Sequence, residues 1–260
     1  MTPATHKIAR YGWVRDLPDI RDLHYASHRM MVEAPPALPP HADLSAQCPA
    51  PYDQGQLGSC TANAIGGAFE FDQIAQGLAS WTPSRLFIYY NERKIEGHIQ
   101  TDSGAQIRDG IKVVAKTGAP PETIWPYNIA RFRAKPSPAA YKAARANTAT
   151  SYFRIDNTDI TQLKSCLAAG YPFVFGITVY GSFESQAVAA NGIVPMPLPS
   201  EQTIGGHAIL GVGYDDATQR FKFRNSWGSA WGDGGYGYLP YAYVTSGSLA
   251  SDFWTIRSVT

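Results

Sequence analysis

The sequence contains few cysteines, no long apolar run and no block of like charge. Its 260 residues include only three cysteines, which is too few for the dense disulfide framework of a small secreted domain. Glycine, proline or a charged residue interrupts every apolar run within about ten residues, so we expect no transmembrane helix. The 22 Lys and Arg residues nearly balance the 21 Asp and Glu residues. This balance argues against nucleic acid or an anionic membrane as a partner.

The N-terminal residues lack the apolar core of a secretory signal peptide. We therefore expect a cytoplasmic protein, with secretion that needs no leader as the alternative. Cys48 and Cys166 could form one disulfide and leave Cys60 free, and the sequence does not decide whether they do. Histidines and cysteines do not occur at metal-ligand intervals, so we expect neither a metal nor another cofactor. We also expect a monomer.

What the sequence does contain is the composition of a folded globular protein. Hydrophobic residues make up 44% and charged residues 17%, which excludes disorder as a description of the whole chain. Residues 1–37 mix charged and apolar side chains without a period and lead into a proline-rich stretch at 33–40. We interpret 1–37 as an extended N-terminal arm, a candidate regulatory segment, and 38–260 as one domain.

Helical signals dominate the first half of this domain. Apolar residues recur at helical spacing after Cys60, which predicts a helix that begins there. A second helix is predicted to start with Thr82 as its N-cap and Pro83 in its first position. A third is predicted from a capping box formed by Ser103 and Gln106.

Strand signals dominate after residue 150. The segments there are short, rich in β-branched and aromatic residues, and bounded by Gly, Pro or Asp. Helices first and strands second is the order of an α+β protein. We therefore predict a helical lobe at about 50–148 and an antiparallel β lobe at about 149–239, with a site in the cleft between them.

Four residues offer what a reactive cysteine needs. Cys60 would lie at the first turn of its helix, where unpaired N–H groups and the helix dipole favour a thiolate. His207 can act as a base, and Asn225 can orient its ring by accepting the second imidazole N–H. The side-chain amide of Gln54 and the N–H of Cys60 could together bind an oxyanion. Each of these residues taken alone has an ordinary structural explanation, such as a small buried thiol or a core histidine.

These four residues lie in three stretches that resemble the motifs of a known family. They are QGQLGSCTANA at 54–64, GGHAILGVGYDD at 205–216 and RNSWGSAWGDGGYGYL at 224–239. The sequence resembles the papain-like (C1) cysteine peptidases, hydrolases in which Gln, Cys, His and Asn occur in this order. Within that family it is most similar to the leaderless bacterial xylellain-like group, whose members carry a similar N-terminal arm.

The resemblance implies a papain-like two-lobe fold, with a helical lobe, an antiparallel β-barrel-like lobe and the active site in the cleft between them. It also implies a thiol protease that hydrolyses peptide or protein substrates without a cofactor. Cys60 would form a thioester with the substrate, and His207 would act as acid and base. Asn225 would orient His207, and Gln54 would contribute to the oxyanion hole.

The resemblance further implies which residues meet the substrate. Gly104 would pair its backbone with an extended peptide, and Ser103 stands beside it where the family usually has another glycine. Gly206 would let a second backbone approach closely, and Trp227 would shield the hydrogen bond between the histidine and the asparagine. Leu57 replaces a cysteine that the family usually has, so a structural disulfide is absent there.

Several alternatives stay open at this point. The same residues would also serve transpeptidation or deamidation, and a binding module without activity would keep the same fold. The floor of the main specificity pocket is expected near Gly104, Ile177 and residues 238–244. The arm has two interpretations: its segment at 11–23 gates the cleft, or it straps one lobe from outside.

Overall fold

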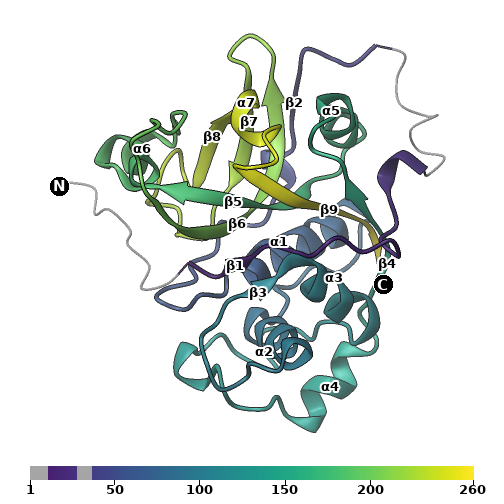
Figure 1. Cartoon of the computed structure of the whole chain (residues 1–260). Coiled ribbons are helices and arrows are strands. Elements are labelled where there is room, and N and C mark those ends of the chain that lie inside the picture. Colours follow the sequence, from purple (N-terminus) through teal and green to yellow (C-terminus); the bar gives the residue numbers. More distant parts are fainter. Residues whose placement is uncertain (1–10, 28–36) are drawn as a thin grey trace.

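The computed structural model describes residues 11–27 and 37–260. They form two lobes, with the helices α2, α3 and α4 below and the large sheet above in Figure 1. This arrangement confirms the α+β prediction. Helix α1 (Cys60–Ala75) lies at the boundary between the lobes and is buried on nearly all sides, because elements of both lobes pack against it.

The helical lobe gathers around the face of α1 that points away from the sheet. The residue before α1, Ser59, is its N-cap, so the helix begins at the residue predicted from the sequence. The other helices of this lobe are α2 (Arg85–Glu96), α3 (Ile107–Lys116) and α4 (Pro138–Ala144).

Two predicted helix starts are wrong by a few residues. The N-cap of α2 is Ser84, whose Oγ accepts the N–H of Phe87 at 3.2 Å, whereas Pro83 forms a β-bridge. Ser103 and Gln106 do not form a capping box, and Gln106 caps α3 without a side-chain hydrogen bond. Gln106 instead belongs to the short strand β3 (Ala105–Gln106), where its N–H donates to Oε1 of Glu96 at 2.7 Å. Pairing with other segments therefore outweighed the local capping signals.

The β lobe is one antiparallel sheet of seven strands. Along the sheet the order is β4-β9-β5-β6-β7-β8, and β2 pairs with β6 beside this path. The strands β4 and β8 lie at its two ends, and the described part of the chain shows no pairing between them, so the expected barrel-like lobe is an open sheet. Its strands are β2 (His41–Asp43), β4 (Ala149–Ile155), β5 (Phe173–Tyr180), β6 (Thr203–Asp215), β7 (Arg220–Arg224), β8 (Tyr236–Pro240) and β9 (Ala250–Val259).

The sheet extends beyond the limits predicted for the β lobe, 149–239. Strand β2 precedes that range and β9 follows it, and both pair with strands inside it. The α-helices that border the sheet are α5 (Ile160–Ala168), α6 (Gln186–Asn191) and α7 (Tyr241–Val244). Short 3₁₀ turns occur at Tyr25–Ser27, Ser45–Gln47, Ile129–Arg131 and Gly181–Glu184.

The described part of the arm, residues 11–27, runs along the boundary between the lobes (Figure 1). Its strand β1 (Trp13–Val14) pairs in parallel with β3, so that Trp13 lies opposite Ala105. Further along, the N–H of Arg154 on β4 donates to the carbonyl of Leu23 at 2.7 Å. The arm therefore contacts both lobes. The remaining arm residues, 1–10 and 28–36, lie outside the described part of the chain.

All three cysteines are free thiols. Cys48 and Cys166 therefore form no disulfide, which decides the question that the sequence left open. Cys166 is fully buried, as its place on the apolar face of α5 predicts. No helix among residues 11–27 and 37–260 is long and apolar enough to cross a membrane.

Candidate active site

Cys60 is the first residue of α1 and has no exposed surface. The backbone of Ala208, on β6, and that of Gly12, in the arm, lie close enough to the thiol to lower its pKa. Burial is the largest cause that raises the pKa of this thiol, to about 12. With the arm in this place, burial therefore disfavours the thiolate.

His207 precedes Ala208 on β6, so this strand places His207 next to the residue whose backbone lies near the thiol. Its Nε2 lies 2.8 Å from Oδ1 of Asn225, and both residues are buried. The indole of Trp227 packs beside the imidazole with 5.0 Å between ring centres and 30° between planes. The hydrogen bond between His207 and Asn225 is thus enclosed, because Trp227 is itself only 4% exposed.

Gln54 lies in the loop before α1 and is fully buried. Its side-chain oxygen accepts the hydroxyl of Ser226 at 2.6 Å, and one N–H of its amide donates to the carbonyl of Leu57 at 2.9 Å. The backbone N–H of Gln54 also donates to the carbonyl of Ser226 at 2.9 Å. These contacts hold the amide in one orientation, and its second N–H has no hydrogen-bond acceptor recorded among the described residues.

The glycines predicted to meet the substrate lie against the backbone of the arm. The N–H of Ala105, next to Gly104, donates to the carbonyl of Gly12 at 2.8 Å. Gly104 has φ = +73°, and a β-carbon there would lie 2.1 Å from the same carbonyl oxygen. A β-carbon at Gly206 would lie 2.5 Å from the carbonyl oxygen of Trp13. The hydroxyl of Ser103 donates a hydrogen bond to the carbonyl of Gly104 at 3.1 Å.

Two aromatic side chains of the arm pack on residues of the β lobe. The ring of Tyr11 meets the ring of His207 edge-on, with 5.9 Å between centres. Trp13 packs so closely on Gly176 that a β-carbon there would lie 1.9 Å from the indole. Its Nε1 donates to Oδ2 of Asp252 at 3.1 Å. Asp252 lies 239 positions from Trp13 and has no motif around it, so the sequence alone does not reveal this contact.

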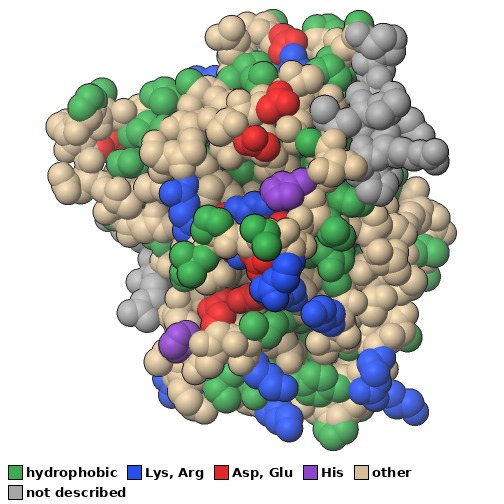
Figure 2. All heavy atoms as spheres, turned by 45° about the vertical axis from the view of Figure 1, so that its right-hand side comes forward, with side chains coloured by type: hydrophobic (Ala, Val, Ile, Leu, Met, Phe, Trp, Pro, Cys, Tyr) green, Lys and Arg blue, Asp and Glu red, His purple; other side chains and the backbone are tan. Residues whose placement is uncertain are grey.

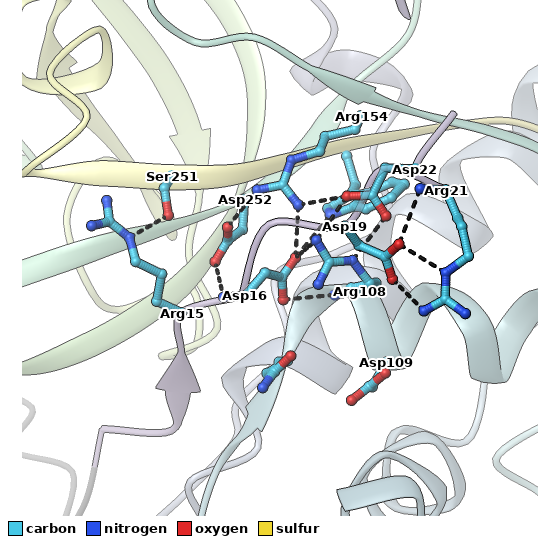
Figure 3. A network of polar contacts seen from close by, with 12 residues as sticks. Arg15, Asp16, Asp19, Arg21, Asp22, Arg108, Asp109, Arg154, Ser251 and Asp252 are labelled. Carbon is cyan, nitrogen blue, oxygen red and sulfur yellow. Dashed lines mark hydrogen bonds and ion pairs between the residues drawn. The ribbon is translucent and has the colours of Figure 1, made fainter. Parts of the chain in front are cut away.

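A cluster of charged residues fixes the arm beyond this point (Figure 3). The carboxylate of Asp22 accepts hydrogen bonds from Nε and Nη2 of Arg108, on α3, at 2.9 and 2.7 Å. Arg154, on β4, donates to Asp22 at 3.0 Å and to Asp16 at 3.3 Å, and its other nitrogen donates to Asp252 at 2.9 Å. Acidic and basic side chains also lie side by side near the middle of the face shown in Figure 2. The arm is therefore bound to the helical lobe and to the β lobe at once.

The described contacts place the arm near the thiol and against both lobes. Residues 11–13 lie across the thiol, and residues 16–22 connect the two lobes.

Comparisons with known proteins agree with this geometry. The model of the papain family cysteine proteases matches residues 38–251. The chain belongs to this family. It is a papain-like cysteine peptidase, a hydrolase with the two-lobe fold described above.

Its similarity to two proteins extends over nearly the whole chain. The crystal structure of xylellain, a cysteine protease from Xylella fastidiosa, is 45% identical, and 96% of each chain is covered at a TM-score of 0.86. An uncharacterized peptidase C1-like protein of Acanthamoeba polyphaga mimivirus is 43% identical over 98% of this chain and 89% of its own. Cathepsin L of Sarcophaga peregrina is 27% identical over 71% of this chain, which spans about half, 53%, of that protein.

The described residues hold no metal site. No group of three or more His, Cys, Asp or Glu side chains within 11–27 and 37–260 is arranged to bind a metal ion.

Proposed function

We propose that this peptidase hydrolyses peptide bonds through a thioester on Cys60, with His207 as acid and base. The observation that carries the proposal is the position of Cys60. It begins α1, and its thiol lies against β6, the strand that carries His207. Asn225, which follows β7, lies 2.8 Å from Nε2 of this histidine. The first turn of a helix stabilises a thiolate through its unpaired N–H groups and its dipole.

The reaction begins when the arm has left the cleft and an extended peptide replaces it. The thiolate attacks the peptide carbonyl, and the oxyanion accepts hydrogen bonds from the N–H of Cys60 and the second N–H of Gln54. His207 gives its proton to the departing amine, and then takes a proton from the water that hydrolyses the thioester. Because Asn225 holds Nε2, Nδ1 is the nitrogen that exchanges these protons. Mass spectrometry of the products tests this, since transpeptidation and deamidation leave different masses.

We also propose that the arm restrains this activity by competing with the substrate. It covers the thiol, pairs with the strand after Gly104 and packs the indole of Trp13 on Gly176. A peptide substrate needs the same surfaces. The arm would therefore lower the apparent affinity for substrate without changing the rate of the chemical step.

Gln54→Ala is expected to lower turnover and leave the Michaelis constant nearly unchanged. An oxyanion donor acts mainly in the transition state, and its loss costs about 2.7–4 kcal/mol in the acylation barrier. The measurement is kcat and KM with a peptide substrate. Gln47→Ala, at an exposed glutamine outside the site, is the matched control. An effect of Gln54→Ala on KM alone would contradict the oxyanion role and indicate substrate binding.

Asn225→Ala is expected to lower kcat less than His207→Ala. Water can partly replace the amide that orients the imidazole, whereas no neighbouring group can replace the imidazole in proton transfer. The two variants should be compared at saturating substrate, after titration of the reactive thiol. Equal losses in both variants would contradict this division of roles.

A further inference from the structure

We propose that Asp102 is a positioning residue for this peptidase: its carboxylate ties the turn that precedes Cys60 to the backbone of Gly104. The proposal rests on the proposed function, because Cys60 is the nucleophile there and Gly104 lies on the substrate side of the cleft. Asp102 acts through the two backbone segments that it joins.

The tie is a continuous chain of hydrogen bonds. The N–H of Gly58, two residues before Cys60, donates to both carboxylate oxygens of Asp102 at 3.1 Å each. The hydroxyl of Tyr89, on α2, donates to Oδ1 of the same carboxylate. The hydroxyl oxygen of Tyr89 in turn accepts the N–H of Gly104 at 3.1 Å. Gly58 and Gly104 are thus linked through two side chains.

Each link has a fixed direction. Burial is the largest cause that raises the pKa of Tyr89 above its ordinary value, and the hydrogen bond to Asp102 adds to it. The phenol therefore keeps its proton, donates it to the carboxylate and offers its lone pair to Gly104. A carboxylate is an acceptor only, so it can serve Gly58 and Tyr89 at the same time. Neither an amide nor a hydroxyl at position 102 would accept from both with the same strength.

The loop that carries Asp102 is held independently. The guanidinium of Arg93, on α2, is buried and donates to the carbonyls of Ile99 and Thr101 at 3.0 Å each. It also lies 4.1 Å from the ring centre of Tyr89. Arg93 therefore fixes the backbone that precedes Asp102, and this holds the carboxylate in place for Gly58.

The position of the tie explains why it matters for the reaction. Leu57 stands where the family usually has a disulfide cysteine, so the turn at 57–59 lacks that covalent anchor. The N–H of Gly58 donates to Asp102 instead. This turn sets where the thiol and N–H of Cys60 lie, while Gly104 sets where the substrate backbone lies. A misplacement of about 1 Å between reacting groups can cost about a hundredfold in rate.

Asp102→Ala is expected to lower kcat about tenfold per titrated thiol, because the turn before Cys60 loses its acceptor. At saturating substrate the arm no longer competes, so kcat reports the geometry of the site rather than the opening of the arm. Tyr89→Phe keeps the bond between Asp102 and Gly58 and releases only Gly104. It is therefore expected to raise KM and to leave kcat within about twofold of the unchanged protein.

The matched control is Thr101→Ala, which removes an exposed hydroxyl from the same loop and keeps its backbone. It should leave both constants unchanged. Amide hydrogen exchange of the full chain gives a second readout that needs no activity. In Asp102→Ala the N–H of Gly58 and the N–H of Gly104 should both lose protection, and in Tyr89→Phe only that of Gly104.

Two results would overturn the proposal. One is a kcat of Asp102→Ala equal to that of Thr101→Ala. The other is protection of the Gly58 amide that survives in Asp102→Ala. If the unchanged protein hydrolysed no peptide, the proposed function would fail, and the exchange pattern would still decide whether the tie exists.

Discussion

Replacing Cys60 by alanine is expected to abolish peptide hydrolysis while the fold stays intact. The substitution removes one sulfur atom from the first turn of α1 and changes little of the packed volume. In a covalent mechanism without its nucleophile, turnover falls by about 10⁴-fold or more. Cys60→Ser should be nearly as inactive, because a serine hydroxyl is not deprotonated by a partner suited to a thiolate.

The measurement is cleavage of casein or of a peptide pool, together with labelling by an epoxide that alkylates thiols. The matched control is Cys48→Ala, at a half-buried free thiol near Leu44. The control should keep full activity and one labelled cysteine. Wild-type cleavage by purified Cys60→Ala would show that Cys60 is not the nucleophile. Labelling of Cys60 without any hydrolysis would favour the binding module over the peptidase.

Gly12→Ala is expected to open the cleft and to accelerate both the labelling of Cys60 and the hydrolysis of small peptides. A β-carbon at position 12 would lie 1.8 Å from the carbonyl oxygen of Gly58 and 2.4 Å from its carbon. Both are backbone atoms and cannot turn aside, so the arm must move away. Overpacking of this kind costs about 1–3 kcal/mol, and we expect labelling to become about tenfold faster or more.

The labelling rate should also change with pH in this variant. Burial raises the pKa of Cys60 to about 12 while the arm covers it. Loss of the arm removes much of that burial, so the pKa falls and the thiolate forms at lower pH. The half-maximal pH of labelling should therefore be lower in Gly12→Ala than in the unchanged protein.

The matched control is Gly247→Ala, where a β-carbon meets no atom within 4 Å. It should leave labelling and melting temperature unchanged. If the arm were only a strap, Gly12→Ala would lower the melting temperature and leave labelling as slow as before. This substitution is a cleaner test than deletion of the arm, because deletion also removes Asp16 and Asp22. Arg108 and Arg154, largely buried, would then lose carboxylates that they now bind.

The sequence by itself determined those features of this protein that depend on neighbouring residues in the chain. The apolar spacing after Cys60 predicted the start of α1, because periodicity is a property of one helix. The order of helices and strands predicted two lobes, because each element must cover an apolar face. The family motifs around Cys60, His207, Asn225 and Gln54 predicted which side chains would meet, and the structure brings them to one cleft.

Tertiary structure alone decided what depends on pairs of residues far apart in the chain. Strand β3 pairs with β1 of the arm, and this pairing outweighed the capping box that was predicted from Ser103 and Gln106. Trp13 meets Asp252 across 239 positions, and Asp102 meets Gly58 across 44. No periodicity or motif encodes such contacts, because each residue alone has many partners of suitable chemistry. Only the packing of the two lobes around α1 selects one of them, and it thereby places the arm over the thiol.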